Sequence, residues 1–193
     1  MVYDQRFYQP RMKEEYFDCH VPLDEAGFAK YVIAKYLEKS EDCVELRLFG
    51  VFGKHEDYAI RFISNAICKA MFDLPITINQ DRVFDYLYIK DLIAVVRYFI
   101  ENNPKHRVYN VSSGNCVRLT QLADLVKNVF HKNIPVLVKN PGLGVEYSAD
   151  NKRLLSEFKD VSFTGLEQAI KELSIWYIGN KKKKKKKILL VDK

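Results

Sequence analysis

Apolar and polar positions follow one another along the chain with two different spacings, which predict helices and strands in turn. Between residues 24 and 39, apolar side chains recur at the i, i+3, i+4, i+7 spacing of one helix face. Further helices are predicted at 58–72, 92–101, 120–130 and 166–177. Short apolar or alternating runs predict strands between the helices, at 44–49, 76–78, 108–111 and 134–138.

Several polar residues stand where helices are predicted to begin. Asp24 can act as the N-cap of the first helix, and Glu25 adds negative charge near the positive end of the helix dipole. Asp91 and Thr120 are expected to cap the helices that follow them, and Thr164 is expected to open a capping box. The predicted helices therefore have start signals of their own.

The composition is that of a globular protein without a membrane segment. Of the 193 residues, 48% are hydrophobic and 13% aromatic, enough to bury a core in one domain or a domain and a fraction. No apolar run reaches the ~18 residues of a membrane span, and the N-terminus lacks a signal-peptide pattern, so a cytoplasmic location without a membrane partner is expected. The cysteines are scattered without metal-ligand spacing, which predicts reduced thiols and no metal site.

Most of the net positive charge lies in one short run near the C-terminus. The net charge is +6, and Lys181–Lys187 contributes seven positive charges, so the remainder of the chain carries −1. A block of like charges predicts a solvated, disordered tail, with nonspecific binding to RNA or anionic lipid as its alternative role. The folded part has no charge excess that would indicate a nucleic-acid partner.

The first predicted helix carries a motif with chemical meaning. The string from Ala26 to Lys30 resembles the Tyr-Gly-x-Ser/Ala-Lys signature of the extended short-chain dehydrogenase/reductase family, the NAD(P)-dependent epimerases, dehydratases and reductases of nucleotide sugars. The resemblance implies that the tyrosine is the acid/base and that the lysine binds the cofactor ribose and lowers the tyrosine pKa. Here Ala26 stands at the tyrosine position, so the catalytic hydroxyl is lost, whereas Lys30 is retained as the catalytic and cofactor-binding lysine.

A literal Tyr-x-x-x-Lys, from Tyr31 to Lys35, follows five residues further along the same helix. Five positions correspond to a rotation of about 140° around a helix, which turns this pair away from a cofactor placed for Ala26 and Lys30. Tyr31 and Lys35 are therefore interpreted as helix-surface or subunit-contact residues, with a catalytic role as the alternative.

Two later segments extend the resemblance. Arg47 and Gly53 match the family's Arg-x-x-Asn-x-x-Gly run, with Gly50 in place of the asparagine. The stretch from Arg82 to Leu92 resembles the family's Arg-Asp-Phe-x-Tyr-Val-x-Asp-Leu segment, whose arginine holds the nucleotide diphosphate. Transferred to this chain, the role implies that Arg82 binds substrate phosphate, because a guanidinium fork matches two phosphate oxygens. A surface ion pair is the alternative reading of Arg82.

Near the C-terminus, the segment from Asn140 to Lys152 resembles the family's Arg-Pro-Gly-Asp…Asp-x-x-Lys pattern. Asn140 and Leu143 replace the arginine and the aspartate that clamp phosphate and ribose in many members. These replacements remove charge from the expected ligand site.

The resemblance implies an α/β fold: the C-terminal part of a Rossmann-type doubly wound sheet plus a small α/β substrate-binding domain. It covers residues 1–178 as a partial epimerase/dehydratase domain, followed by the lysine-rich tail over 179–193. No Gly-x-x-Gly-x-x-Gly or Gly-x-Gly-x-x-Gly turn occurs in the sequence, so the N-terminal nucleotide-binding half is expected to be missing.

The function implied is hydride transfer at a sugar carbon of a nucleotide-activated sugar, by an epimerase, dehydratase or reductase. NAD or NADP is the implied cofactor, and the chain alone is expected to bind it poorly and to be inactive. The alternative is a noncatalytic pseudoenzyme or dimerisation remnant of the family. The expected partners are the nucleotide sugar and either a second copy, through helix 24–39, or a separate N-terminal half.

Overall fold

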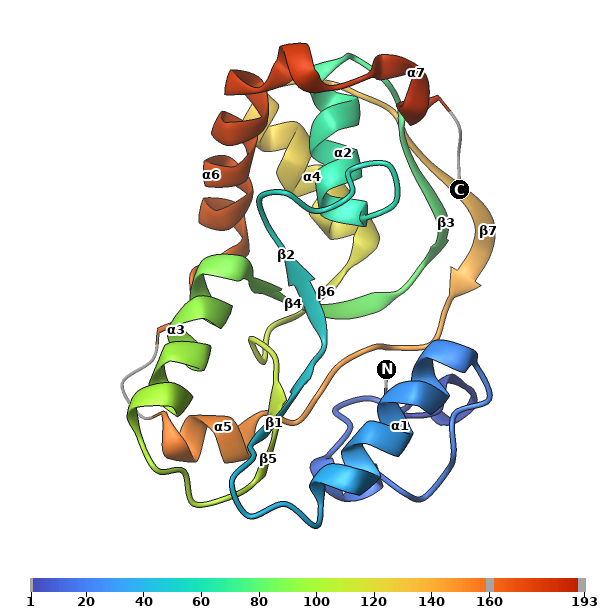
Figure 1. The fold of residues 1–193 in the computed structure, drawn as a ribbon. Helices are drawn as coiled ribbons and strands as arrows, with labels where there is room; N and C mark the ends of the chain where they lie inside the picture. The colour runs from blue at the N-terminus through green and yellow to red at the C-terminus, as the bar shows by residue number, and fades with distance from the viewer. Residues whose placement is uncertain (1, 159–161, 191–193) are drawn as a thin grey trace.

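The computed structural model describes residues 2–158 and 162–190, and its fold is α/β as predicted. Figure 1 shows short strands running through the middle of the molecule with helices packed around them. The helices of four or more residues are α1 (Glu25–Leu37), α2 (Phe62–Met71), α3 (Ile89–Glu101), α4 (Leu119–Phe130), α5 (Lys152–Glu157), α6 (Leu166–Gly179) and α7 (Lys186–Leu189). The strands are β1 (Glu45–Leu48), β2 (Gly50–Phe52), β3 (Ile76–Asp81), β4 (Val83–Tyr88), β5 (Val108–Val111), β6 (Cys116–Arg118) and β7 (Val136–Leu143).

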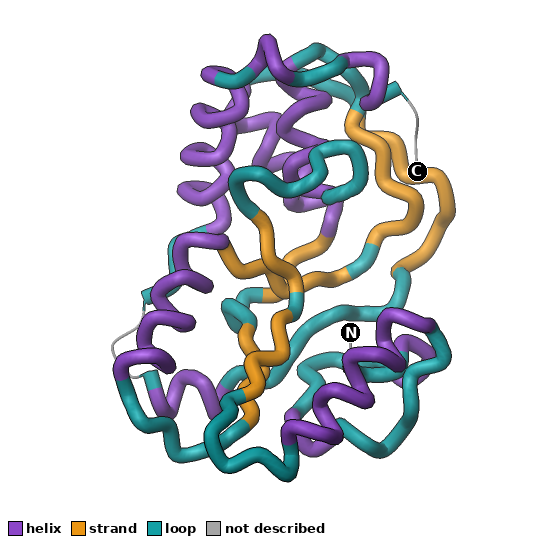
Figure 2. Tube along the Cα trace, in the orientation of Figure 1, coloured by secondary structure: helices purple, strands orange, loops and turns teal. Residues whose placement is uncertain are grey.

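The described strands form three small sheets, mostly with parallel pairing. β1 pairs with β5, and β3 pairs with β7, each in parallel. β4 lies between β2, which is parallel to it, and β6, which is antiparallel. Figure 2 shows β3 and β7 running side by side along one edge of the molecule. Parallel pairing with helical crossovers is the pattern expected for part of a doubly wound fold.

The strand predicted at 44–49 is β1, which ends at Leu48. After Phe49 the chain enters β2 and changes its partner strand from β5 to β4. A Cβ atom added to Gly50 would lie 2.6 Å from the backbone oxygen of Asp85. Glycine is therefore required where the chain crosses from one sheet to the next, because any side chain would collide with β4.

The largest core lies where α2, α4 and α6 pack together beside β3. Ile67, Leu122 and Ile170, one from each helix, are completely buried there. The helix predicted at 58–72 begins only at Phe62, and Ile60, expected on its apolar stripe, is 55% exposed in the preceding loop. The loop before α2 is instead available to line a cavity.

A smaller core joins the N-terminal segment to α1 and to the end of β1. Its buried members include Tyr3, Phe17 and Ala34. Asp24 caps α1 as predicted, since its carboxylate accepts a hydrogen bond of 2.8 Å from the N–H of Gly27. The apolar face predicted for this helix lies mostly at the surface, with large exposed side chains at Phe28, Val32, Ile33 and Tyr36.

Three of the expected helix caps are wrong, because carboxylates and hydroxyls from distant segments bind each other instead. Asp91 lies inside the first turn of α3 and accepts hydrogen bonds of 2.9 and 2.8 Å from the N–H and hydroxyl of Thr164. Thr164 therefore opens no capping box, and α6 begins after Gly165. Thr120 lies inside α4, where its hydroxyl donates a 2.9 Å hydrogen bond to Asp81.

The lysine-rich tail also differs from its prediction. Residues 181–183 form a short 3₁₀ helix, α7 follows, and Leu189 is only 2% exposed within the main core. In Figure 1 this segment crosses the end of the molecule near α2 and α6. An apolar residue after the run gives the tail a core contact that its charge pattern does not reveal. Residues 191–193 of the predicted tail lie outside the described residues.

Among the described residues, no helix has the length and apolar character needed to cross a membrane.

Candidate functional site

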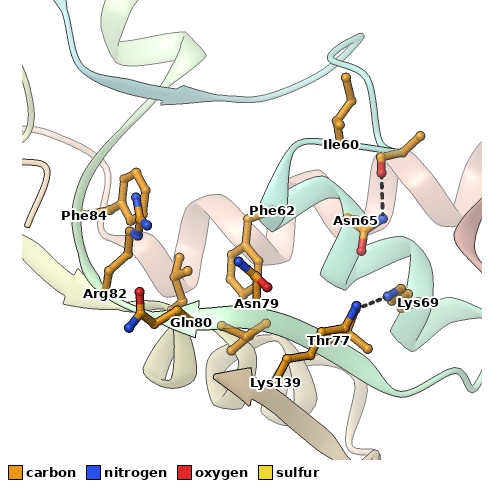
Figure 3. Close-up of a pocket in the computed structure, with 13 residues that line it drawn as sticks. Ile60, Phe62, Asn65, Lys69, Thr77, Asn79, Gln80, Arg82, Phe84 and Lys139 are labelled. Atoms are coloured by element: carbon orange, nitrogen blue, oxygen red, sulfur yellow. Dashed lines mark hydrogen bonds between the residues drawn. The ribbon is translucent and has the colours of Figure 1, made fainter. Parts of the chain in front are cut away.

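A cavity beside β3 contains Arg82, the residue expected to bind phosphate (Figure 3). It is bounded by the loop before α2, by α2 itself, by β3 and the start of β4, and by β7. The lining residues are Ala59, Ile60, Phe62, Asn65, Lys69, Thr77, Ile78, Asn79, Gln80, Arg82, Phe84, Leu119 and Lys139. Three cations, several amides and two phenyl rings therefore border one space.

Arg82 stands between β3 and β4, where the chain passes from one sheet to the other. Its guanidinium carbon lies 5.9 Å from the centre of the Phe84 ring. Within residues 2–158 and 162–190, no carboxylate forms a salt bridge with Arg82. The surface ion pair considered as the alternative for Arg82 is thus not formed among the described residues.

The segment after β7 approaches Arg82 closely. A Cβ atom added to Gly144 would lie 3.3 Å from Nε of Arg82 and 2.9 Å from Oε1 of Gln80. The two residues that replace charged family residues lie on β7, where Asn140 pairs with Gln80 and Leu143 pairs with Asp81. Asn140 donates a 3.0 Å hydrogen bond from its amide to Asn79. Asn140 thus contributes an amide next to the cavity, and Lys139 of the same strand contributes a cation to its lining.

The opposite wall is supplied by α2. Asn65 and Lys69 are one turn apart on this helix, so they point to the same side. Nζ of the buried Lys69 donates a 2.5 Å hydrogen bond to the hydroxyl of Thr77, which ties α2 to β3. The amide of Asn65 donates a 3.0 Å hydrogen bond to the backbone oxygen of Tyr58 and so holds the preceding loop.

A second cavity adjoins the first and shares Ile60, Phe62 and Phe84 with it. Its polar lining includes Glu56 and Tyr147. Burial raises the pKa of Glu56, although the carboxylate accepts a hydrogen bond from Ser64. Burial likewise raises the pKa of Tyr147, so this phenol stays protonated at neutral pH.

Ala26 and Lys30 lie outside both cavities. Both are exposed on α1, and no residue of α1 lines either the Arg82 cavity or its neighbour. The structure therefore does not bring Lys30 and Arg82 into one site within the described residues.

Tyr31 and Lys35 both point to Asp18 in the N-terminal segment. The Tyr31 hydroxyl donates a short hydrogen bond to Asp18, and Nζ of Lys35 lies 2.9 Å from the other oxygen of that carboxylate. Nζ of Lys35 is also 2.7 Å from Glu38. The hydrogen bond to Asp18 raises the pKa of Tyr31, the opposite of what a catalytic base requires. This geometry supports the helix-surface interpretation of the pair.

Arg47 has a structural role, away from the cavities. It is 4% exposed, pairs with Glu45 at 2.9 Å, and donates hydrogen bonds to the Tyr3 hydroxyl at 3.2 Å and to the Glu14 backbone oxygen at 3.1 Å. Its guanidinium also lies over the Phe17 ring, 4.1 Å from the centre. Arg47 thus fastens the N-terminal segment to β1.

The features of the family's dinucleotide site can be compared with the described residues. The sequence has no glycine-rich turn to receive a pyrophosphate at a helix N-terminus. Lys30, the remaining residue of the cofactor motif, is exposed on α1, and β1 has a single partner strand among the described elements.

Sequence reasoning found Arg82 but missed most of the residues around it. Asn65 and Lys69 had a signal, since these polar residues stand four positions apart in a mostly apolar helix. Thr77 and Asn79 alternate with apolar residues along β3, which marks one face of that strand. Lys139 lies far along the chain and reaches the cavity only because β7 pairs with β3.

Comparison with known proteins gives concordant results. The curated ADP-L-glycero-D-manno-heptose-6-epimerase of Brachyspira hyodysenteriae is 27% identical over 169 residues, covering 78% of this chain and 53% of that protein. The UDP-glucose 4-epimerase of Thermotoga maritima, solved with UDP-glucose, aligns with TM-score 0.75 and 19% identity over 89% of this chain and 58% of its own. A GDP-L-fucose synthetase from Naegleria fowleri gives TM-score 0.75 with 14% identity over 96% and 64% of the two chains.

The chain thus spans little more than half the length of the curated relative that it matches. The two solved structures share its fold. The sequence model of the NAD dependent epimerase/dehydratase family matches residues 11–112, more than half of the 193 residues. The chain belongs to the NAD dependent epimerase/dehydratase family.

Proposed function

We propose that this chain holds the nucleoside diphosphate part of a nucleotide sugar in the Arg82 cavity. The observation that carries the proposal is Arg82 itself, an arginine without a salt bridge in the described chain, in a cavity also lined by Lys69 and Lys139. Two relatives support the substrate class, since one is named an ADP-heptose epimerase and the other a UDP-glucose epimerase.

The chemistry of the lining suits such a ligand. A guanidinium can donate two parallel hydrogen bonds to phosphate oxygens, and a diphosphate offers negative charge to neighbouring lysines as well. The exposed Asn79 and the half-buried Gln80 supply amide donors and acceptors for a ribose or a base. Phe62 and Phe84 supply flat apolar surface for the base.

The same chain alone is proposed to carry out no hydride transfer. Ala26 has no group that can give or take a proton, and the motif residue Lys30 lies outside the cavity. Activity on a nucleotide sugar would require the cofactor-binding part of the family fold, supplied by the same polypeptide or by another one. The edge of β1 that has no partner strand among the described residues is the place where that part is proposed to pair, because an unpaired strand edge is a template for a further strand.

A noncatalytic role is the second candidate, and Ala26 favours it. In that case the chain would keep the family scaffold as a binding or dimerisation module. The surface of α1 supports an association with a second copy, since Val32, Ile33 and Tyr36 are 50%, 58% and 76% exposed. Exposed aromatic and branched side chains on one helix are typical of contact surfaces.

The proposal is tested by calorimetric titration with UDP, ADP and GDP, each with matched monophosphate and nucleoside. We expect the diphosphate to bind more tightly than the nucleoside, and Arg82→Ala to weaken binding by ~10-fold, because a charge-assisted hydrogen bond contributes about 1.5–3 kcal/mol. Arg97→Ala is the matched control, since Arg97 is exposed on α3 and already paired with Glu101 at 2.7 Å.

Equal losses in the two variants, or equal affinity for diphosphate and nucleoside, would reject the Arg82 cavity as a diphosphate site. Binding that depends on Arg82 without any turnover would favour the noncatalytic candidate over an enzyme half. Turnover that appears only when a cofactor-binding half is added would favour the enzyme.

A further inference from the structure

Three aromatic rings surround the ammonium group of Lys184 in the lysine run. Nζ of Lys184 lies 4.6 Å from the ring centre of Tyr58, 4.9 Å from that of Tyr177 and 5.2 Å from that of Trp176. A cation within about 6 Å of a ring face is attracted by the ring quadrupole, and the attraction increases when the cation is partly withdrawn from water. Lys184 is half-buried, so this condition is met.

The rings are arranged as walls rather than as a stack. The Tyr177 ring is inclined by 75° to Trp176 and by 70° to Tyr58. Burial raises the pKa of Tyr177, which keeps that phenol neutral. Neutral faces meeting at steep angles form a concave site for a compact cation, which is the geometry of aromatic cages that bind alkylammonium groups.

Among the described lysines of the run, Lys184 is the one whose ammonium group contacts these three rings. Lys182 and Lys183, its neighbours in the run, are exposed and face no aromatic ring in the described chain. The backbone on either side of Lys184 is held as well. The N–H of Lys185 donates a 3.1 Å hydrogen bond to the Tyr58 hydroxyl, and Leu189 is buried in the main core.

We propose that Tyr58, Trp176 and Tyr177 form an alkylammonium-binding site, with Lys184 as its built-in ligand. The site joins elements that are distant in the sequence, because Tyr58 belongs to the loop before α2 and the other two rings belong to α6. His55 of the same loop also contacts the Trp176 ring, 5.0 Å between centres. The occupied cage thus fastens the loop before α2 to α6 and to the C-terminal segment.

This connection reaches the Arg82 cavity. Ala59 and Ile60, which follow Tyr58 directly, line that cavity. Asn65 holds the same loop from the other side through the backbone oxygen of Tyr58. Release of Lys184 therefore removes one attachment of a loop that borders the cavity, whatever ligand the cavity accepts.

The single tryptophan, Trp176, is the probe for the test. Its accessibility is measured by acrylamide quenching, because a neutral quencher is not concentrated by the lysine run. In Lys184→Gln we expect the docked-to-released ratio of the tail to fall by ~5-fold, the effect of a cation–π contact of ordinary strength, with a matching rise in quenching. Lys182→Gln is the matched control, since it removes the same charge from the same run and is expected to leave quenching unchanged.

The preference of the aromatic site for an alkylammonium ligand is tested in the full-length Lys184→Gln chain, in which the site has lost its own lysine. Tetramethylammonium is expected to produce a saturable change in Trp176 emission, weaker in the wild-type chain because Lys184 competes for the cage. Tert-butyl alcohol, similar in size and uncharged, is expected to produce none. Lys184→Arg, which keeps a cation, is expected to restore wild-type quenching.

The proposal is overturned if acrylamide quenches Trp176 equally in Lys184→Gln and Lys182→Gln. It is also overturned if tert-butyl alcohol and tetramethylammonium change the Trp176 emission equally. Far-ultraviolet circular dichroism shows whether Lys184→Gln remains folded; should it unfold, rescue by Lys184→Arg but not by Lys184→Met supports a cage for a cation, and equal rescue by both refutes it. None of these measurements depends on nucleotide binding at Arg82.

Discussion

Two helices of similar apolar content have opposite surroundings in this molecule. Nearly all of α2 is buried: from Ile63 to Met71, only Asn65 is partly accessible, and it faces a cavity. Over its thirteen residues, α1 buries only Gly27 and Ala34, and it exposes Ile33 and Tyr36 to solvent. The local sequence pattern predicts both helices. Packing against surrounding side chains stabilises nearly every residue of α2, whereas α1 has such contacts along a small part of its surface.

The strands show the same contrast. β4 has a partner on each side, whereas β1 has β5 on one side and no strand of the described chain on the other. The helix α2 thus lies within a buried core, while α1 and β1 present more surface among the described residues. This difference predicts that the two regions respond differently to mutation.

The largest effect is expected at Arg47, which fastens the N-terminal segment to β1. Arg47→Ala removes one partner of a nearly buried ion pair with Glu45 and leaves the Tyr3 hydroxyl with one hydrogen bond fewer. Breaking such a pair costs about 3–5 kcal/mol, because a charge remains buried without its partner. Hydrogen exchange should show faster exchange in the N-terminal segment and α1 while α2, α4 and α6 stay protected. Uniform acceleration would show that the two regions unfold together.

A somewhat smaller effect is expected in the main core. Ile67→Ala, at a fully buried position of α2, should lower the free energy of unfolding by about 2–5 kcal/mol, through lost transfer energy and the cavity left behind. Ile33→Ala on α1, at a 58% exposed position, should change it by less than about 0.5 kcal/mol. Urea titration measures both, and similar losses would contradict the distinction between the two helices.

Association through α1 is expected to be weaker still. Replacing Ile33 and Tyr36 together by glutamate should shift sedimentation from dimer towards monomer without loss of helicity, because both side chains are exposed. Ile100→Glu on α3 is the control, since Ile100 is 79% exposed on a different helix. A dimer that persists in the double variant would refute the contact.

The smallest predicted effect is a change of folding stability with pH, caused by Glu56 in the lining of the second cavity. Burial raises the pKa of Glu56 in the folded chain above the ordinary glutamate value of 4.5, so protonation of this carboxyl stabilises the folded state relative to the unfolded one. This contribution is fully present below pH 4.5 and is lost as the pH rises through the folded pKa. Glu56→Gln should therefore gain stability relative to wild type as the pH rises across that window in urea titrations. A difference that is constant with pH would mean that the Glu56 pKa is not raised.

Much of the secondary structure could be predicted from the sequence, because it follows local rules. The helical spacing of α1 and the Asp24 cap need only neighbouring residues, and both were predicted. The caps at Asp91 and Thr120 failed because their hydrogen-bond partners, Thr164 and Asp81, are distant in the sequence. A carboxylate or hydroxyl binds whichever donor or acceptor the fold brings nearest, and no local pattern contains that information.

The candidate site divides in the same way. Arg82 was found because it stands in a motif, but its availability depends on the absence of a nearby carboxylate in the described fold. Lys139 and Asn65 join it only through strand pairing and helix packing. Ala26 and Lys30 keep their predicted register on α1, yet they lie outside the cavity that holds Arg82.

The sequence by itself determined the five longer helices and four of the described strands, since each depends on residue identity and short-range spacing. The family resemblance and the alanine at position 26 are likewise read from residue identity. Only the tertiary structure decided that β1 has β5 as its single partner strand among the described residues and that the apolar face of α1 lies at the surface. It also decided that Lys184 enters a ring of aromatic side chains rather than solvent. The physical reason is that burial, strand pairing and cation–aromatic contacts are set by segments far apart in the chain, which approach one another only when it folds.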